Sequence, residues 1–370
     1  MLAVDLMTRF AERTGLSSGR APQRYLWTDA FAVCNFLGLA HHTGDARYRE
    51  LAAQLIHHVH HVLGRHRSDD ARQGWISGLS EADGEAHPTL GGLRIGKPLP
   101  ERPPDEPVDE RLEWDRDGQY FHYLTKWMHA LDRFAGATGR AGLARQACEL
   151  VDAAHRTFVY GPRDHRRMYW KMSIDLARPQ VASMGHHDPL DGYVTCLALE
   201  ATRAELGVRG PDLGDAIAEF RAMIEPEALA TGDPLGIGGL LVDAHRLTQL
   251  GLHEGLRAAI LRAAELGLAH YAADPDLQRP ASQRLAFREL GLAIGLSAAA
   301  RLDVAPRFAR YAGLGRTIES FWLDPDHRRA ATWVQHLDIN EVMLATSLLP
   351  DGFLGVLAPS GAAHTARAAR

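Results

Sequence analysis

Apolar residues recur along almost the whole chain at intervals of three or four positions, the spacing that places them on one face of an α-helix. Stretches that alternate between apolar and polar residues, as a half-buried β-strand requires, are scarce. The pattern therefore predicts an all-α protein whose loops contain a few short strands.

The predicted helices are of two kinds. Outer helices are amphipathic: in residues 45–63, Tyr48, Leu55 and Val59 share one face, and charged residues occupy the reverse. Inner helices, such as residues 29–41, are apolar or small on nearly every side, so other helices must enclose them. Outer helices are expected near residues 1–14, 45–63, 142–158, 212–224, 254–272 and 307–321, and inner helices near 29–41, 118–136, 190–206, 235–249, 284–301 and 339–349.

The two kinds alternate, which predicts six helical hairpins. Each inner helix runs into a short turn with a helix-stopping glycine and a capping residue, as at residues 43–45. Six hairpins that close into a double ring form an (α/α)6 toroid, here a single domain over residues 1–357. Closure requires the first outer helix to pack beside the last inner one. Residues 358–370 are small and polar and are expected to form a flexible tail.

The connections indicate where function lies. Inner-to-outer connections are short, whereas two outer-to-inner connections, residues 65–117 and 159–189, are exceptionally long. All outer-to-inner loops open at the end of the ring where the inner helices begin, which we call the mouth. Long ordered loops usually carry function, so the mouth is the predicted active site. We expect residues 65–117 to form a rim or lid, and residues 168–175 to form a short strand or hairpin.

Composition and charge narrow the range of partners. The formal net charge of -5 and a pI near 6.5 argue against a nucleic-acid partner. The three cysteines are far apart within apolar runs and are expected to be reduced thiols. No stretch approaches the roughly 18 apolar residues of a membrane span, and residues 1–15 lack a secretory signal pattern. These features predict a cytoplasmic protein without a membrane partner, and they leave the oligomeric state open.

Acidic residues stand beside aromatic residues or histidines at nearly every inner-helix start, and helix capping accounts for several of them. Asp29, Glu289 and Glu341 lie on otherwise apolar helices and must be paired or face a wet cavity. Carboxylates and aromatic rings together suit sugars, whose hydroxyls bind the former and whose C–H faces stack on the latter. The catalytic candidates are Asp29, Glu113, Asp115, Asp188 and Asp191. The substrate-binding candidates are Trp27, Trp75, Trp114, Tyr120, His122, Trp170, Lys171, His187, Arg288, Glu289, His336, Asn340 and Glu341.

Two short motifs support this interpretation. The Trp-x-Asp start at residues 27–29 and the Thr-Gly-Asp-x-x-Tyr turn at residues 43–48 resemble the six-hairpin glycosidases, particularly the unsaturated glucuronyl and rhamnogalacturonyl hydrolases. The resemblance implies the toroid and assigns Asp29 as general acid/base. Residues 187–193 are similar to the family's His-Asp-x-Gly-aromatic segment, where a second aspartate sits near the substrate. In the family this segment precedes the Trp-x-Asp helix, whereas here it follows it.

The favoured hypothesis is a glycoside hydrolase that acts on a saccharide without a cofactor. Such an enzyme needs one protonated and one ionised carboxyl group. Asp29 is the expected proton donor, and Asp188 or Asp191 the expected base. The converging helix N-termini favour an anionic or polyhydroxyl ligand. One alternative is a sugar epimerase or polysaccharide lyase that uses His187 or His336 as base. Another is a non-catalytic helical binding protein, which would be an open solenoid.

A group of histidines on the second outer helix raises the question of a metal. His57, His58, His60 and His61 include pairs three and four residues apart, a spacing that zinc sites use. No carboxylate is close to them in sequence. We therefore expect ordinary surface or crevice histidines and no metal site.

Overall fold

In the computed structural model, which describes residues 1–273 and 275–355, twelve main helices alternate between outer and inner positions of a ring. The outer helices are α1 (Leu2–Arg13), α3 (Arg47–Leu63), α7 (Ala141–Phe158), α9 (Gly214–Met223), α11 (Glu254–Ala273) and α14 (Ala312–Leu323). The inner helices are α2 (Leu26–Thr43), α6 (Phe121–Thr138), α8 (Asp188–Glu205), α10 (Pro234–Leu250), α12 (Ala286–Ala299) and α16 (Leu337–Leu348). The predicted tail, residues 358–370, lies outside the described residues.

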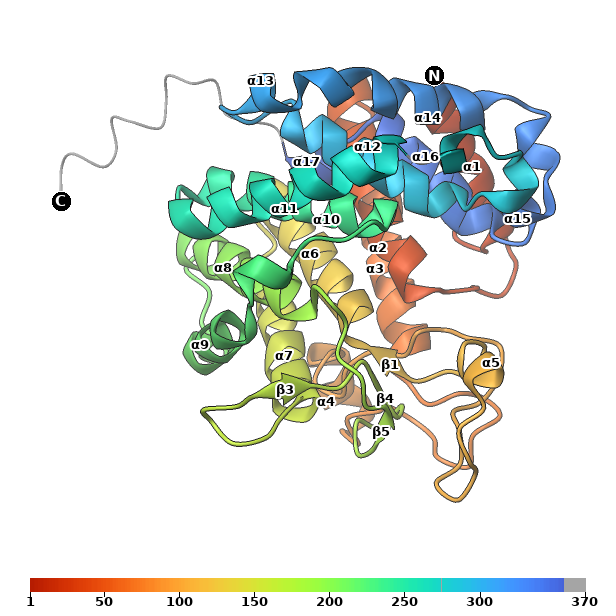
Figure 1. The fold of residues 1–370 in the computed structure, drawn as a ribbon. Helices are drawn as coiled ribbons and strands as arrows, with labels where there is room; N and C mark the ends of the chain where they lie inside the picture. Colours follow the sequence, from red (N-terminus) through yellow and green to blue (C-terminus); the bar gives the residue numbers. More distant parts are fainter. Residues whose placement is uncertain (274, 356–370) are drawn as a thin grey trace.

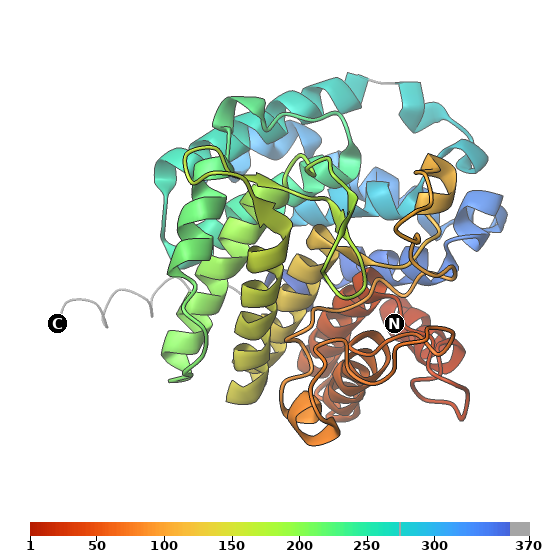
Figure 2. The ribbon, with the colours of Figure 1, turned by 90° about the horizontal axis from the view of Figure 1, so that it is seen from below.

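The inner helices form a closed ring. Each packs on the next in the order α2, α6, α8, α10, α12 and α16, and α16 returns to α2. At the ring seam, where the first and last helices of the ring meet, α1 packs on α16. Arg9 and Arg13 of α1 donate hydrogen bonds to Glu341 of α16 at 2.9 and 2.7 Å. Figure 1 shows α1 beside α16, and Figure 2, seen from below, shows the chain colours running round the ring. The (α/α)6 toroid is confirmed, and the open solenoid is excluded.

The pattern of side chains explains the two kinds of helix. Every residue of α2 from Leu26 to Ala40 is buried, whereas α3 buries only one face. Left-handed glycines end α2 and α6, with φ of 73° at Gly44 and 70° at Gly139. Where α10 crosses α12, a Cβ on Gly238 would lie 2.2 Å from the carbonyl oxygen of Gly291. The glycine-rich start of α10 is therefore a close-packing feature.

The two long loops build the mouth. Residues 65–117 contain α4 (Glu81–Ala86) and α5 (Glu110–Glu113), and Asp117 anchors them by accepting from Arg94 at 2.6 Å and Arg67 at 3.3 Å. Antiparallel strands follow, so the strand prediction for residues 168–175 is confirmed. One sheet has the order β1 (Gln119–Tyr120), β4 (Lys171–Met172) and β5 (Pro179–Val181), and β2 (Val159–Tyr160) pairs with β3 (Arg167–Met168).

The opposite end of the ring has a floor. The short helix α17 (Asp351–Leu354) packs against α2, α6 and α10. Its Phe353 stacks on Phe31 with ring centroids 4.6 Å apart, and the Phe353 carbonyl bonds with Nε2 of His129 at 3.0 Å. The remaining short helices are α13 (Ala305–Phe308) and α15 (Ala331–Val334), with 3-10 turns at Pro226–Ala228, Pro275–Gln278, Ala281–Gln283, Ala309–Tyr311 and His327–Arg329. Within the described chain, no helix is both long and apolar enough to cross a membrane. Cys34, Cys148 and Cys196 are all buried free thiols.

Candidate functional site

A cavity of about 260 Å³ occupies the centre of the ring, and all six inner helices contribute to its wall. The first turns of α2, α6, α8 and α10 contribute Trp27, His122, Asp188 and Gly236 to this wall, and Phe353 of the floor helix also lines the cavity. The lining residues are Trp27, Phe31, His122, Lys126, His129, Trp170, Gly185, His186, His187, Asp188, Asp191, Asp233, Leu235, Gly236, Gly238, Gly239, Val242, Asp243, Arg246, Gly291, Ile294, Met343 and Phe353.

Asp188 is the first residue of α8 and is buried. Its Oδ2 atom has no hydrogen-bond partner in the described protein. Burial, and then the negative charge of Asp191, raise the pKa of Asp188 to about 7. A carboxyl group with this pKa holds a proton near neutral pH, which is the state that a general acid needs.

Asp191 lies one turn further along α8 and has the opposite character. Its carboxylate accepts hydrogen bonds from the Thr125 hydroxyl and from Nζ of Lys126 at 2.6 Å, and Arg246 lies 3.8 Å away. Burial alone would raise the pKa of Asp191. The charges of Lys126 and Arg246 and the two hydrogen bonds outweigh burial and leave the pKa lowered. Asp191 is therefore an ionised carboxylate on the cavity wall.

A third carboxyl group, Asp243 of α10, completes the acidic wall. Burial, and then the charge of Asp191, raise its pKa to about 7, although Arg246 lies 3.6 Å from its Oδ1 atom. Of these three carboxyl groups, Asp191 is ionised, whereas Asp188 and Asp243 are protonated in a large fraction of molecules near neutral pH. Lys126 and Arg246 supply positive charge beside Asp191.

Several buried polar atoms on this wall have no partner in the described protein. Such atoms are uncommon in folded proteins and mark places where water or a ligand binds. In the cavity they include both donors and acceptors, which suits a ligand with many hydroxyl groups. The atoms are Trp27 Nε1, His122 Nδ1, His129 Nδ1, Asp188 Oδ2, Asp191 Oδ1 and Arg246 Nη2.

Aromatic rings line the approach to the carboxylates. His122 stacks on Trp170 with an interplanar angle of 11°, and burial lowers the pKa of His122 to about 3, so its ring is neutral. Trp170 also borders a second cavity, of about 420 Å³, on the rim beside Tyr120 and Trp114. Trp114 is 53% exposed and meets Trp170 edge to face. The rim groove and the central cavity thus share one aromatic wall.

The structure brings together part of the predicted set. Of the candidates, those that line the central cavity are Trp27, His122, Trp170, His187, Asp188 and Asp191. Glu113, Trp114 and Tyr120 line the rim groove, where Trp170 joins them. Arg288 reaches the mouth indirectly, through a 2.7 Å contact from its Nη1 atom to Asp233. The other candidates lie elsewhere.

Asp29 does not line either cavity. It lies two residues after Trp27, which places it on another side of α2. There it is buried against Arg24, with 3.5 Å between Nη1 and Oδ1, and its Oδ2 accepts the Tyr25 N–H at 3.0 Å. Burial raises the pKa of Asp29 to about 6 despite Arg24. The structure gives Asp29 a helix-start contact and an internal ion pair, and no access to the central cavity.

Glu289, Asn340 and Glu341 are also paired inside the protein rather than directed into a cavity. Glu289 accepts from Arg284 at 2.7 Å and from the Trp322 indole at 2.7 Å, and Glu341 accepts from α1 at the ring seam. Asn340 accepts the Phe287 N–H and donates to backbone carbonyls. The sequence predicted that acids on apolar inner helices are either paired with another group or face a water-filled cavity. Glu289 and Glu341 are paired. His336 is exposed at the start of α16, outside both cavities.

Three further candidates support the rim. Lys171 is fully buried and its Nζ donates to Glu113 Oε1 at 2.8 Å, so this ion pair holds the loop together. Asp115 is exposed on the rim outside both cavities. Trp75 is only 2% exposed, lies beneath the Arg65 guanidinium and packs on Gly84. Its ring offers no free face for a sugar.

The sequence interpretation missed Lys126, His129, Asp243 and Arg246. Each is a polar residue in the middle of a helix expected to be enclosed. A signal was present, because charged residues on an enclosed helix must converge on something polar. The spacing of 122, 126 and 129 on α6, and of 243 and 246 on α10, places each set on one helix face.

Known proteins resemble this chain in fold and not in sequence. No known family matches the sequence, and a search of curated proteins finds no relative. Two solved structures are similar in fold: a variant of UGL with dGlcA-Glc-Rha-Glc, and the unsaturated glucuronyl hydrolase of Bacillus sp. GL1, described as responsible for the degradation of glycosaminoglycan. Each is 17% identical, with 94% of both chains covered and a TM-score of 0.41. The six-hairpin fold of this chain is established by its own ring of helix contacts.

Proposed function

We propose that this chain is a carbohydrate-active enzyme, and specifically a glycoside hydrolase that works in the central cavity. The observation that carries the proposal is the pair Asp188 and Asp191, one protonated and one ionised, on the same face of α8. Aromatic rings and unpartnered polar atoms surround this pair. Together they supply acid, anion and sugar-binding surface in one enclosed space.

In the proposed reaction Asp188 donates its proton to the glycosidic oxygen as the bond to the anomeric carbon breaks. Positive charge then develops on the sugar ring, and the carboxylate of Asp191 stabilises it. Water adds to the anomeric carbon, and a proton from that water restores Asp188. The Oδ2 atom of Asp188 and the Oδ1 atom of Asp191 have no hydrogen-bond partner in the described protein, and in this proposal they are the atoms that take these roles.

The cations of the cavity have two roles in this proposal. Lys126 keeps Asp191 ionised, and the unpartnered Nη2 atom of Arg246 is available to a hydroxyl or carboxylate of the ligand. Trp27 and Trp170 offer ring faces and, in the case of Trp27, an unpartnered indole N–H. An anionic sugar would be compatible with this wall.

Asp29 is replaced by Asp188 as the proposed proton donor. The resemblance to six-hairpin hydrolases assigns the acid role to Asp29, but its carboxylate is enclosed by Arg24 and the Tyr25 backbone. Direct proton transfer requires hydrogen-bond reach of the substrate oxygen. Asp188 lines the cavity and Asp29 does not.

A sugar epimerase or lyase is the second candidate, and one observation favours it. His122 lines the cavity with a neutral ring, and its Nδ1 atom has no hydrogen-bond partner in the described protein, so this nitrogen is a candidate to accept a carbon-bound proton. The histidines expected for that role are less suitable, because Nε2 of His187 is bonded to the Leu229 carbonyl at 2.8 Å and His336 lies outside the cavity.

A substrate screen with two matched variants tests the proposal. Wild-type protein, Asp188→Asn and Asp29→Asn would be incubated with aryl glycosides, unsaturated uronides and free sugars. We expect cleavage of a glycoside, with turnover lowered about 10³-fold by Asp188→Asn and little changed by Asp29→Asn in folded protein. Full activity of Asp188→Asn, or loss confined to Asp29→Asn, would refute the assignment. Interconversion of free sugars without glycoside cleavage would favour the epimerase.

A further inference from the structure

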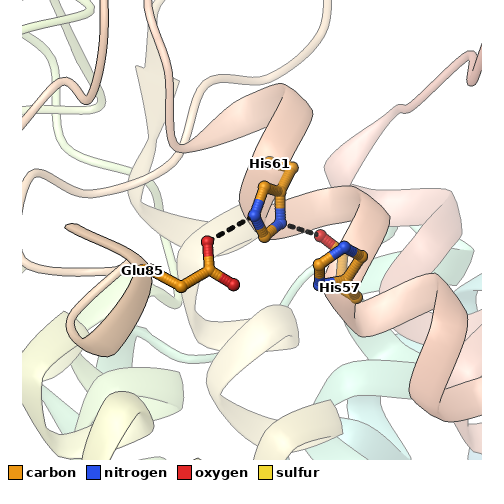
Figure 3. Close-up of side chains that lie close together, drawn as sticks. All are labelled: His57, His61 and Glu85. Carbon is orange, nitrogen blue, oxygen red and sulfur yellow. Dashed lines mark hydrogen bonds and ion pairs between the residues drawn. The ribbon is translucent and has the colours of Figure 1, made fainter. Parts of the chain in front are cut away.

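A second cluster of chemically capable side chains lies outside the ring, on the surface of α3. His57 and His61 are one helical turn apart, and Glu85 of α4 approaches them from the rim loop (Figure 3). One ligand atom from each residue lies within 4.8 Å of the others. No carboxylate was expected near these histidines. That expectation is wrong, because the fold brings Glu85 to within 2.6 Å of His61.

We propose that His57, His61 and Glu85 form a binding site for a zinc ion, with water completing the coordination. Two imidazoles and one carboxylate are a donor set that zinc accepts, and oxygen-seeking ions such as Mg²⁺ do not prefer it. Tetrahedral bonds of about 2.0 Å place ligand atoms about 3.3 Å apart. The Nε2 atom of His61 lies 2.6 Å from the Oε2 atom of Glu85, and one ligand atom of each of the three residues lies within 4.8 Å of the others, so small movements of exposed side chains suffice to reach that spacing.

The orientation of His61 supports a ligand role. Its Nδ1 atom lies 2.8 Å from the carbonyl oxygen of His57, so Nδ1 is the protonated nitrogen that donates. The lone pair of Nε2 then points toward the carboxylate of Glu85. Metal-bound histidines characteristically donate their other N–H to a carbonyl or carboxylate in this way. Two acceptors facing each other require a shared cation between them, either a proton or a metal.

The surroundings leave the cluster accessible and electrostatically suitable. His57 and Glu85 are exposed and His61 is partly exposed. The guanidinium of Arg65 lies over the Trp75 ring, whose edge meets His61, and is paired with Glu81 at 3.0 Å, which offsets its charge. The rings of His57 and His61 lie 3.9 Å apart between centroids, on the same face of α3.

A bound ion would fasten the rim loop to the ring. Glu85 belongs to the first part of residues 65–117, whereas both histidines belong to an outer helix that is rigidly packed on α2. Zinc would join the two by a link that does not depend on the chemistry of the central cavity. The inference therefore stands apart from the proposed function.

Zinc titration of the complete chain, without a histidine tag and after treatment with a chelator, tests the site. Calorimetry should find one zinc per chain, and each of His57→Ala, His61→Ala and Glu85→Gln should weaken binding at least about tenfold. His42→Ala, which removes an exposed histidine at the end of α2, should bind as wild type does. Zinc should raise the unfolding temperature of the wild type and of His42→Ala, but not that of the three site variants. Mg²⁺ should raise the unfolding temperature of none of these proteins.

Two results would overturn the site. Absence of saturable zinc binding would mean that His61 and Glu85 share only a proton. Binding that survives Glu85→Gln, a replacement of the same shape on an exposed residue, would show that the carboxylate is not a ligand. Because Glu85→Gln removes no packing, this variant keeps the test decisive even if a histidine variant fails to fold.

Discussion

Replacement of Asp188 by asparagine should lower turnover about 10³-fold and also make the folded protein more stable at alkaline pH. Asparagine has the same shape and is neutral at every pH. In the wild type, burial and the charge of Asp191 raise the pKa of Asp188 from 3.8 to about 7. Ionisation of this carboxyl group therefore costs more free energy in the folded protein than in the unfolded chain. The asparagine variant cannot ionise and does not have this cost.

The sign and size of the effect follow from proton linkage. The folded protein holds the Asp188 proton more tightly than the unfolded chain, so stability falls as pH rises from about 4 to about 7. A pKa raised from 3.8 to about 7 corresponds to about 4 kcal/mol once the pH exceeds both values. The free energy of unfolding of Asp188→Asn should exceed that of the wild type by an amount that grows over this range and approaches about 4 kcal/mol.

Urea unfolding of both proteins across this pH range measures the difference, and two neighbouring variants are controls. The variant Asp233→Asn changes another residue of the same cavity: asparagine can still cap α10 at Gly236, and the variant loses only the ion pair with Arg288. It should show no alkaline gain. Asp191→Asn should be destabilised, because Lys126 loses its 2.6 Å partner. A variant Asp188→Asn that is no more stable than wild type at alkaline pH would refute the reasoning.

Three further outcomes are expected. Activity should fall as pH rises through about 7, because Asp188 must be protonated to act, and kcat/KM measured against pH reports this; a profile that rises through neutrality would contradict the assignment. Lys126→Met should lower kcat about 10²-fold while the protein stays folded, since Asp191 loses the ammonium that keeps it ionised; unchanged kcat would exclude that role. Glu341→Ala should lower the free energy of unfolding by about 1 kcal/mol and leave kcat unchanged, because Arg9 loses its partner at the ring seam while Arg13 keeps Asp338; a loss of kcat in folded protein would place Glu341 in the site.

The helical ring was predictable because its signals are local. An inner helix such as α2 must be apolar on all sides, and an outer helix such as α3 must not, so the alternation can be read residue by residue. Left-handed glycines at residues 44 and 139 mark the tight turns. The position of the mouth followed from loop length alone.

The side chains of the cavity were less predictable because local sequence does not say which way an inner helix faces. Asp29, Asp191 and Glu341 share one signature, an acid on an otherwise apolar helix. Their environments differ because of distant partners: Arg24 for Asp29, Lys126 for Asp191, and α1 for Glu341. Which acid pairs with an internal cation and which one lines the cavity depends on how the helices pack in the closed ring.

The seam between α1 and α16 has a consequence for biosynthesis. Arg9 and Glu341 are separated by 332 positions in the chain, and the floor at Phe353 lies further still. The helix α1 leaves the ribosome long before α16 and must therefore keep its apolar face exposed, or held by a chaperone, until residues 337–355 have been made. Contacts of such large sequence separation form late and slowly. The cavity has neither a complete wall nor a floor until that last segment docks, so an incompletely translated chain cannot bind ligand there.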